Sequence, residues 1–433
     1  MTPAAQLQAT VEILEKLEKN PSAADKLVRE WGRAHRFAGS HDRKAITARL
    51  YAVLRSQGRL SWRTRSNSPR LLVFASLVDE GTNLEALDAL CNGAVHHPAS
   101  LSIDERAALT SLPDETMPLW ARANIPPFLE ESLKRALGED LEREILALNE
   151  RAPLDLRVNT LKTSRANAIE TLVAEGHSAS PCPYSPYGLR LVPGAPIDRM
   201  SLYENGAIEI QDEGSQLAAL IALGGSATQQ VVDYCAGAGG KSLAMASAMA
   251  NRGQIHASDT DKSRLNRLEL RMARAGTRNL QIHPPFSLGL AIPGGADLVL
   301  LDVPCSGSGA WRRNPENRWR LTPERFKEHC ARQGELLEEG ARLVKPGGRL
   351  AYVTCSLFHE ENEDQIGAFL QRHADFKAVP ALEAWAAALP DVAPPPSLMQ
   401  TFGESGVSGA IRLYPGRDGT DGFFICILKR QAA

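Results

Sequence analysis

"QQVVDYCAGAGGKSLAMASAMA", residues 229–250, joins an apolar run of strand type to a glycine-rich turn and a helix of small residues. Glycine lets the backbone approach a ligand closely, and the first turn of a helix offers free N–H groups. The loop carries neither the GxxxxGK[ST] pattern nor the GxGxxG pattern, which makes nucleoside triphosphates and dinucleotides poor fits. The stretch therefore predicts the first strand, loop and helix of a sheet that binds another kind of ligand.

Further strands follow this loop at intervals that leave room for helices. "GQIHASDTDKSRLNRL" (253–268) ends a second strand at Asp259, and "NLQIHPP" (279–285), "ADLVLLDVPC" (296–305) and "GGRLAYVTCS" (347–356) supply three more. Alternating strands and helices predict a parallel sheet with its ligand over the carboxyl ends of the strands, where an acid can bind ribose hydroxyls. We therefore expect a nucleoside cofactor without a diphosphate, and S-adenosylmethionine is the natural candidate.

Two cysteines end apolar strands at this same edge. Cys305 closes the fourth predicted strand and Cys355 closes the fifth. These strands are expected to be neighbours in a parallel sheet, so that both thiols face one pocket. Cys235 is expected to pack within the cofactor turn. The remaining cysteines are interpreted as small buried hydrophobes. They are Cys91, Cys182, Cys330 and Cys426.

Two thiols beside a methyl donor are suited to methylation of carbon 5 of a pyrimidine, which does not react without activation. Carbon 5 is a poor nucleophile, but a thiolate added to carbon 6 makes carbon 5 able to attack a methyl sulfonium. A base must then remove the carbon-5 proton before the thiolate leaves. An ordinary cysteine pKa of about 8.5 leaves little thiolate near neutrality, so a local activator is expected. Asp302, three residues before Cys305, is placed to hydrogen-bond the base and draw electrons from carbon 6.

The composition is that of a globular protein with more than one domain. The 433 residues are 43% hydrophobic and 23% charged, with a net charge of −2. The seven cysteines are irregularly spaced and include no CxxC pair, which argues against a disulfide framework or a structural zinc site. The N-terminus reads as an amphipathic helix, and no apolar run approaches the roughly 20 residues that span a bilayer. We expect a cytoplasmic, reduced monomer that uses neither a metal nor a membrane.

The predicted secondary structure divides the chain into three parts. Residues 1–140 read as successive helices, and residues 141–205 read as a small α+β unit that begins with the strand pattern "APLDLRVNTLK" (152–162). Residues 206–433 form the parallel-sheet part. The predicted fold is therefore a Rossmann-like α/β domain, preceded by a small α+β domain and an all-α domain.

A basic segment lies within the helical region. From Lys26 to Arg70 there are twelve Lys or Arg residues against two acids, a local balance of +10 in a nearly neutral chain. A solvated helix face is the plainer interpretation. The size of the excess nevertheless favours a phosphate-binding surface, since binding to a polyanion releases counterions. The candidate RNA contacts here are Arg43, Lys44 and Arg49.

"WRRNPENRW" (311–319) is a second basic and aromatic stretch, directly after the first of the two strand-end cysteines. Its candidate contacts to an RNA backbone are Arg312, Arg313 and Arg318. The pattern favours packing over base stacking for Trp311 and Trp319. The acids of "HEENEDQIGAFL" (359–370) are interpreted as ordinary complements to a helix dipole.

Six stretches occur in order over about residues 118–430: "RVNTL", "EIQDEGSQL", "DYCAGAGGKS", "DVPCSGSG", "YVTCSLFHEEN" and "DGTDGFFICIL". Together they resemble the RsmB/NSUN family of RNA cytosine-5 methyltransferases. The resemblance implies a class I methyltransferase fold preceded by a small RNA-recognition-like domain. It also implies S-adenosylmethionine as cofactor, RNA as partner, and methylation of cytosine carbon 5 through a covalent cysteine adduct at carbon 6.

The resemblance implies roles for individual residues. Cys355, in the TCS motif, looks like the nucleophile, and Cys305, in the PC motif, looks like the residue that assists release of the methylated product. Asp302 looks placed between cofactor and target base, and Asp259 looks like the ribose ligand. The loop that would wrap the methionine end of the cofactor comprises Cys235, Ala236, Gly237, Ala238, Gly239, Gly240 and Lys241.

Two positions depart from the family pattern. Ala238 stands where the family loop usually carries proline. Pro284 and Pro285 stand where an aspartate usually holds the adenine amino group. Adenine recognition must then use backbone or another residue, and weaker cofactor binding is expected.

The helical region resembles, by texture and arrangement, the NusB-like RNA-binding domain of some bacterial members. This likeness favours small-subunit ribosomal RNA over transfer RNA as substrate. The target cytosine must leave its stack to reach Cys355, so an exposed loop is expected. A catalytically silent RNA-binding assembly factor of the same fold stays open, supported by the missing adenine acid. A Rossmann oxidoreductase is disfavoured because the GxGxxG fingerprint is absent.

Overall fold

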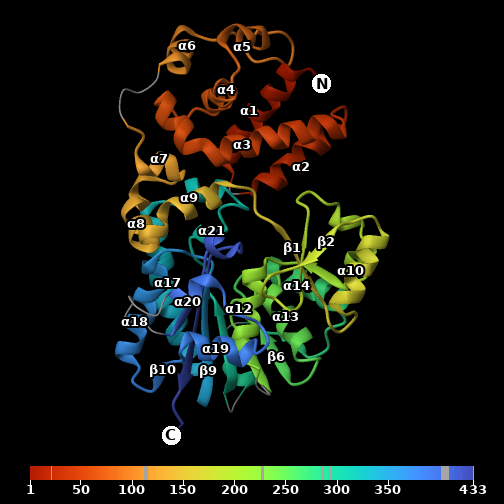
Figure 1. The fold of residues 1–433 in the computed structure, drawn as a ribbon, viewed down its shortest axis with the longest axis vertical. Coiled ribbons are helices and arrows are strands. Elements are labelled where there is room, and N and C mark those ends of the chain that lie inside the picture. Colours follow the sequence, from red (N-terminus) through yellow and green to blue (C-terminus); the bar gives the residue numbers. More distant parts are fainter. Residues whose placement is uncertain are drawn as a thin grey trace. The chain divides into compact units, whose positions relative to one another are not determined.

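The chain folds into two compact units, each described here by itself (Figure 1). The computed structural model describes residues 1–20, 22–111, 116–225, 229–284, 287–292, 295–400 and 409–432. Unit 1 comprises Met1–Lys134, Ile145–Glu150 and Trp311–Thr322, and unit 2 comprises Arg135–Glu144, Arg151–Ala310 and Pro323–Ala433. Two short segments from later in the chain thus pack with the N-terminal helices. Within the described ranges, no helix combines the length and the apolar character that a membrane span requires.

Unit 1 is built around one long helix, α3 (Ser40–Thr64). This helix buries Ile46, Leu50, Val53 and Leu54, whose spacing places them on one face. Other helices pack around it. They are α1 (Pro3–Lys19), α2 (Ala24–Ala34), α4 (Pro69–Asp79), α5 (Leu84–Leu90), α6 (Ile103–Thr110), α7 (Leu119–Ala123) and α16 (Glu316–Arg320). The predicted run of helices is confirmed, and its likeness to NusB stays a prediction.

A buried arginine ties α16 to the rest of unit 1. Arg318 has no exposed surface, and its guanidinium donates to the carbonyls of Asn124 and Leu148, each at 3.0 Å, and to Asn149 Oδ1 at 2.7 Å. Its guanidinium carbon also lies 5.5 Å from the ring centre of Trp311, which is 1% exposed. The packed interpretation of Trp311 is therefore confirmed, whereas Trp319 is half-buried.

Short helices connect the N-terminal helices to unit 2. They are η1 (Pro127–Leu129), α8 (Glu130–Leu137), η2 (Gly138–Asp140) and α9 (Leu141–Asn149).

Unit 2 begins with a small antiparallel sheet. Its strand order is β2-β3-β1-β4, and the strand predicted within 152–162 is β1 (Leu154–Val158). The Ser164 hydroxyl accepts from the Asn167 N–H and so caps α10 (Arg165–Ala174). The other elements are β2 (Ala179–Pro181), β3 (Gly188–Leu191), η3 (Ile197–Arg199), α11 (Ser201–Glu204) and β4 (Ile208–Ile210).

A larger sheet forms the main part of unit 2. Its order is β10-β12-β9-β8-β5-β6-β7, and β11 pairs with β12. The five strands from β9 to β7 run parallel, as predicted, whereas β12 pairs antiparallel with β9. The strands are β5 (Gln230–Asp233), β6 (Gln254–Ala257), β7 (Leu280–Ile282), β8 (Ala296–Asp302), β9 (Val344–Thr354), β10 (Phe376–Ala378), β11 (Ala410–Leu413) and β12 (Phe423–Arg430).

Apolar side chains cover both faces of this sheet. Along β8, Leu298 and Leu300 belong to one buried cluster, whereas Val299 and Leu301 belong to the other. A parallel strand buried on both faces is apolar throughout, which explains the sequence of β8. The elements of this part are α12 (Glu213–Leu223), α13 (Gly240–Ala248), α14 (Lys262–Ala275), α15 (Leu288–Ala291), η5 (Ser308–Ala310), α17 (Pro323–Leu343), η6 (His359–Glu361), α18 (Glu363–Arg372), α19 (Ala381–Ala388), α20 (Pro396–Gln400) and α21 (Pro415–Asp418).

Substituting Arg318→Ala should destabilise unit 1 by about 2–4 kcal/mol, because two buried carbonyls and the half-buried Asn149 side chain lose their donor. Five of the six tryptophans belong to unit 1, so urea unfolding followed by tryptophan fluorescence reports mainly on this unit. Arg36→Ala, at an exposed position, is the control and should change the free energy of unfolding by less than about 0.5 kcal/mol. Equal stability of the two variants would show that Arg318 is not structural.

Candidate active site

The carboxyl ends of the parallel strands bring the predicted site residues together. β5 ends at Asp233, β8 ends at Asp302, and Cys355 directly follows β9. β8 pairs with both β5 and β9, so the predicted adjacency of the two cysteine-bearing strands is confirmed. Parallel strands place these ends at one edge of the sheet.

A cavity of about 530 Å³ lies at this edge. Nearly every predicted catalytic and cofactor residue lines it, and Gly239 is not among the lining residues. Those that line it are Cys235, Ala236, Gly237, Ala238, Gly240, Lys241, Asp259, Asp302, Cys305 and Cys355. The sequence-based selection missed other lining residues from the loop after β5 and from α17, because nothing in their local pattern marks them. These include Tyr234, Arg332, Leu336 and Glu339.

The glycine-rich loop is held against the end of β6. The Gly237 N–H donates to Asp259 Oδ2 at 2.8 Å, and the Asp261 N–H donates to Asp259 Oδ1 at the same distance. Gly239 has a φ of +84°, and a Cβ there would lie 2.1 Å from Leu268 Cδ1. Only glycine fits this turn without displacing α14. Asp259 therefore shapes the loop and also lines the cavity.

A buried ion pair connects the loop to β8. Lys241 Nζ lies 2.7 Å from Asp302 Oδ2 and 5.4 Å from the ring centre of Phe423. Burial alone would lower the pKa of Lys241, but the charge and hydrogen bond of Asp302 outweigh it, so the pKa is raised. The ammonium group thus stays charged inside the site.

The two strand-end thiols are in contact. Cys305 Sγ and Cys355 Sγ lie 3.5 Å apart, although the residues are 50 positions apart in sequence. The contact with Cys355, burial, and the negative charges of Cys355 and Glu361 hold the pKa of Cys305 well above its usual value. Two adjacent thiolates would repel each other, so at most one of the pair carries charge at a time.

The other cysteines sit mostly where they were expected. Cys91, Cys182 and Cys426 are buried, whereas Cys330 is half-buried. Burial raises the pKa of Cys91 to about 11 and that of Cys235 well above its usual value. Cys235 is thus a packed, neutral thiol within the loop.

Asp233 is a buried carboxyl beneath the glycine loop, and it was not among the predicted site residues. Burial raises its pKa to about 7, although Ser242 Oγ donates to its Oδ2 at 2.5 Å. Its position as the last residue of β5 was the one signal in the sequence.

The basic segment of unit 1 is partly neutralised by acids that lie outside it. Arg49 pairs with Glu80 at 2.7 Å. Further ion pairs join Arg59 and Arg63 to Asp79, and Arg70 to Glu105. Arg43 and Lys44 are exposed, as an RNA contact requires. The net charge of +10 counted from Lys26 to Arg70 therefore overstates the unpaired positive charge of the folded unit. Arg49, a predicted RNA contact, is already paired with Glu80.

The stretch 311–319 needs a correction. Arg318 was predicted to contact RNA, and this is wrong, because its guanidinium is fully buried and donates to three acceptors within unit 1. Arg312 is also buried, with 5% exposure, whereas Arg313 is half-buried. An RNA contact through Arg313 stays a prediction.

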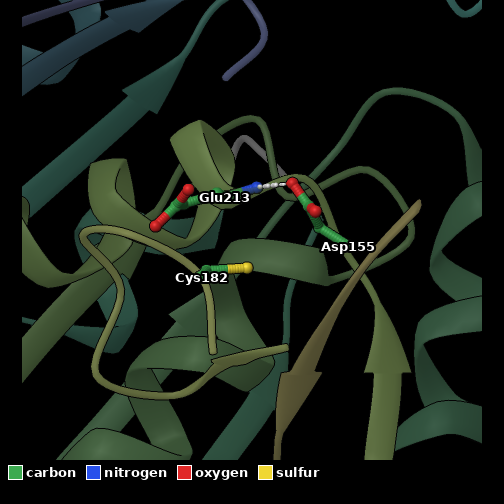
Figure 2. Close-up of side chains that lie close together, drawn as sticks. All are labelled: Asp155, Cys182 and Glu213. Atoms are coloured by element: carbon green, nitrogen blue, oxygen red, sulfur yellow. Dashed lines mark hydrogen bonds between the residues drawn. The ribbon is translucent and has the colours of Figure 1, made fainter. Parts of the chain in front are cut away.

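One group of potential metal ligands occurs among the described residues, in unit 2. Asp155, Cys182 and Glu213 lie close together, and the Glu213 N–H donates to Asp155 (Figure 2). Arg190 already donates to both carboxylate oxygens of Asp155, at 2.7 and 3.0 Å, and lies 3.5 Å from Glu213. The guanidinium thus supplies the positive charge that a metal would otherwise bring.

Of the two prolines that replace the expected adenine-binding aspartate, one lies within the described residues. Pro284 is exposed directly after His283, and Pro285 lies outside the described residues.

Glu339, on α17, is a further acid that lines the cavity. It accepts from Tyr234 Oη at 2.7 Å and from Arg332 at 2.9 Å.

Comparisons with known proteins point to one family. Residues 220–429 match the family described as 16S rRNA methyltransferase RsmB/F, and residues 125–198 match the ferredoxin-like domain of RsmF/B-like methyltransferases. The chain is 32% identical over 364 residues to the probable ribosomal RNA small subunit methyltransferase B of Synechocystis, covering 81% of this chain and 76% of that protein. It is 26% identical over 454 residues to the probable enzyme of the same name from Bacillus subtilis, covering 97% and 98%.

Solved structures extend the likeness to the fold. The crystal structure of PH0851 matches with a TM-score of 0.76 at 28% identity, covering 99% of both chains. A methyltransferase homolog from Pyrococcus horikoshii matches with a TM-score of 0.60 at 30% identity, covering 72% of this chain and 97% of that chain.

The buried Asp233 predicts a specific pH dependence of stability. Its pKa rises from an ordinary 3.8 to about 7 on folding, so the native state binds more protons than the unfolded state between these values. The free energy of unfolding should therefore fall as pH rises through this window and stay lower above it. Asp233→Asn should lessen that fall, as measured by urea unfolding at several pH values between 4.5 and 7.5. Glu383→Gln, at an exposed position of α19, controls for the loss of a carboxylate. An unchanged slope in Asp233→Asn would contradict the assignment.

Proposed function

Since the chain belongs to the RsmB/F family of ribosomal RNA small subunit methyltransferases, which methylate RNA, we propose that it transfers a methyl group to carbon 5 of a cytosine in small-subunit ribosomal RNA. The observation that carries the proposal is the contact of two thiols, 3.5 Å apart, in the cavity that also holds the glycine loop. Paired thiols at this place suit covalent activation of a pyrimidine.

The loop and its neighbours fit S-adenosylmethionine, which we propose as the cofactor. A Cβ at Gly237 would meet no atom nearer than 4.0 Å, so the loop leaves open space beside Asp259. The first turn of α13 supplies N–H groups, and the Asp259 carboxylate can accept from ribose hydroxyls in addition to its backbone donors. When bound, the cofactor supplies an electrophilic methyl group.

Cys355 is the nucleophile in this proposal. The Lys241 ammonium interacts electrostatically with Cys355, and a nearby cation favours the thiolate. The raised pKa of Cys305 suits a thiol that stays protonated during the attack. Its thiolate adds to carbon 6 of the cytosine, which makes carbon 5 nucleophilic. Asp302 accepts from the amino group of the cytosine and so orients the base beside Cys355.

Cys305 assists release of the methylated product. Its sulfur lies 3.5 Å from the sulfur that must leave carbon 6 once the carbon-5 proton has been removed. A residue in contact with the leaving atom can influence departure without taking part in the attack. The two thiols therefore act in different steps.

The names of the relatives direct the choice of RNA. Those of Synechocystis, Bacillus subtilis and Xanthomonas campestris are all called ribosomal RNA small subunit methyltransferase B, and we assign the same class of substrate to this chain. The exposed Arg43 and Lys44 support binding of the RNA backbone by the helical, NusB-like unit.

The Cys305→Ala variant, incubated with cellular RNA and S-adenosylmethionine, should accumulate a denaturant-resistant protein–RNA adduct, because methylation proceeds while thiolate release stalls. Denaturing electrophoresis measures the adduct, and sequencing the trapped RNA identifies the target. The double variant with Cys355→Ala is the control and should form none. Folded protein that binds RNA and cofactor but forms no adduct, with a wild type that transfers no methyl group, would favour the catalytically silent assembly factor. Trapped transfer RNA would overturn the ribosomal assignment.

Asp259→Asn should weaken binding of S-adenosylmethionine by about tenfold, because one carboxylate oxygen that can accept from ribose becomes a donor. Isothermal titration calorimetry measures the change. Asp261→Asn is a matched control two residues away, since Asp261 caps α14 and asparagine caps a helix equally well. Equal affinities for the two variants would remove the ribose role from Asp259.

A further inference from the structure

A single buried carboxylate joins the two loops that carry the thiols. Glu361, at the end of η6, has no exposed surface. Its Oε1 accepts from the Ser306 N–H at 2.7 Å, and its Oε2 accepts from Ser306 Oγ at 2.5 Å and from Ser356 Oγ. Ser306 directly follows Cys305, and Ser356 directly follows Cys355. The carboxylate thus holds the residue next to each thiol.

A side chain from a third element, α17, also donates to this carboxylate. Gln333, on α17, is fully buried, and its Nε2 donates to Glu361 Oε1 at 3.1 Å and to the Pro304 carbonyl at 3.0 Å. Every group that contacts the carboxylate oxygens in these four bonds is a donor. A carboxylate accepts all four bonds. An amide could keep the two N–H donors on its oxygen only by turning its own N–H groups toward the Ser306 and Ser356 hydroxyls, which would reverse two of the bonds and remove the negative charge.

The loops meet a second time, further along the chain. The Leu357 N–H donates to Ser308 Oγ at 2.8 Å, and the Gly309 N–H donates to the Cys355 carbonyl at 2.9 Å. These bonds keep the loops adjacent, but they act three and four residues beyond Cys305. Glu361 binds both residues that directly follow the cysteines, and the hydroxyls of these two residues, Ser306 and Ser356, also lie 3.2 Å from each other.

Glu361 does not line the cavity in which the reaction is proposed to occur. Both thiols line the cavity, and Glu361 is not among the described residues that do. With four donors around it, the carboxylate is also poorly placed to accept a proton from a substrate. It therefore acts through the cysteines and not on the base.

We propose that Glu361 is the positioning residue of the thiol pair: its carboxylate clamps the Cys305 loop to the Cys355 loop and so keeps both sulfurs within contact distance during attack and release. The mechanistic part of this inference rests on the proposed function. The geometric part, that Glu361 sets the separation of the thiols, stands without it. The sequence-based interpretation of this acid as a complement to a helix dipole is corrected, because it is buried before α18 begins at Glu363.

The geometric part can be tested with phenylarsine oxide, without RNA or cofactor. Arsenic in this reagent forms bonds to two neighbouring thiol sulfurs, and one water leaves with the arsenic-bound oxygen and the two thiol protons. The wild type should form this cyclic adduct through Cys305 and Cys355, seen by intact mass and reversed by a dithiol reagent. Glu361→Gln should bind the arsenical about tenfold more weakly, because closing the second bond depends on the proximity of the sulfurs. Cys305→Ala and Cys355→Ala each remove one bond and set the baseline.

The catalytic part is tested on the same variant. Methyl transfer to RNA by Glu361→Gln should fall by about a hundredfold, as displacement of a reacting group by about 1 Å can cause. Thermal stability and affinity for S-adenosylmethionine are measured in parallel, and a residue that serves only the fold would change these instead of arsenical binding. Glu328→Gln, exposed on the same helix as Gln333, is the matched control and should behave as the wild type.

The outcomes separate the two claims. Folded Glu361→Gln that binds phenylarsine oxide and methylates RNA as the wild type does overturns the inference. Weaker arsenical binding in the variant, together with a wild type that transfers no methyl group, supports the clamp while the proposed function fails. If Glu361→Gln does not fold, Ser356→Ala removes one of the four donors and should show a smaller loss of arsenical binding. Unchanged binding in a folded Ser356→Ala would then overturn the clamp.

Discussion

The parallel pairing of β8 with β9 is the constraint on which the site depends. Asp302 lies opposite Val353 in this register, so Cys305 and Cys355 leave the sheet at the same edge and meet at 3.5 Å. A slip of one residue would turn every β9 side chain to the other face of the sheet. The apolar layers on both faces oppose such a slip, because they bury alternate residues of the same strands. The core of unit 2 thereby brings the two strand-end sulfurs to one edge of the sheet.

The ionisable side chains at this edge of the sheet have hydrogen-bond or ion-pair partners. Lys241 is paired with Asp302, Asp233 accepts from Ser242, and Glu361 accepts from four donors. Removing a charge from water is costly unless hydrogen bonds or an opposite charge compensate it. Each compensating contact also restricts the side chain that makes it. The stabilising contacts of the edge therefore also orient the groups proposed to act on the base.

Unit 1 shows how far charge counted along a sequence can differ from charge presented to a partner. Its basic segment receives acids from elsewhere in the same unit, as Glu80 does for Arg49. Arg318 is buried and donates to two backbone carbonyls and one side-chain amide. Fewer cations of the segment, Arg43 and Lys44 among them, stay exposed and available for the proposed contact with RNA. Long-range contacts decide this, and sequence counting does not detect them.

The sequence by itself predicted the parallel sheet, the glycine loop, and the adjacency of the two strands whose cysteines meet at one edge. These follow from local hydrophobic pattern, from turn chemistry and from the rule that parallel strands end together. Only the tertiary structure decided that Arg318 is structural, that burial raises the pKa of Asp233 to about 7 and that Glu361 joins the two thiol loops. Burial and hydrogen-bond partners depend on residues far away in the chain, such as Asn124 for Arg318, and no local pattern encodes them.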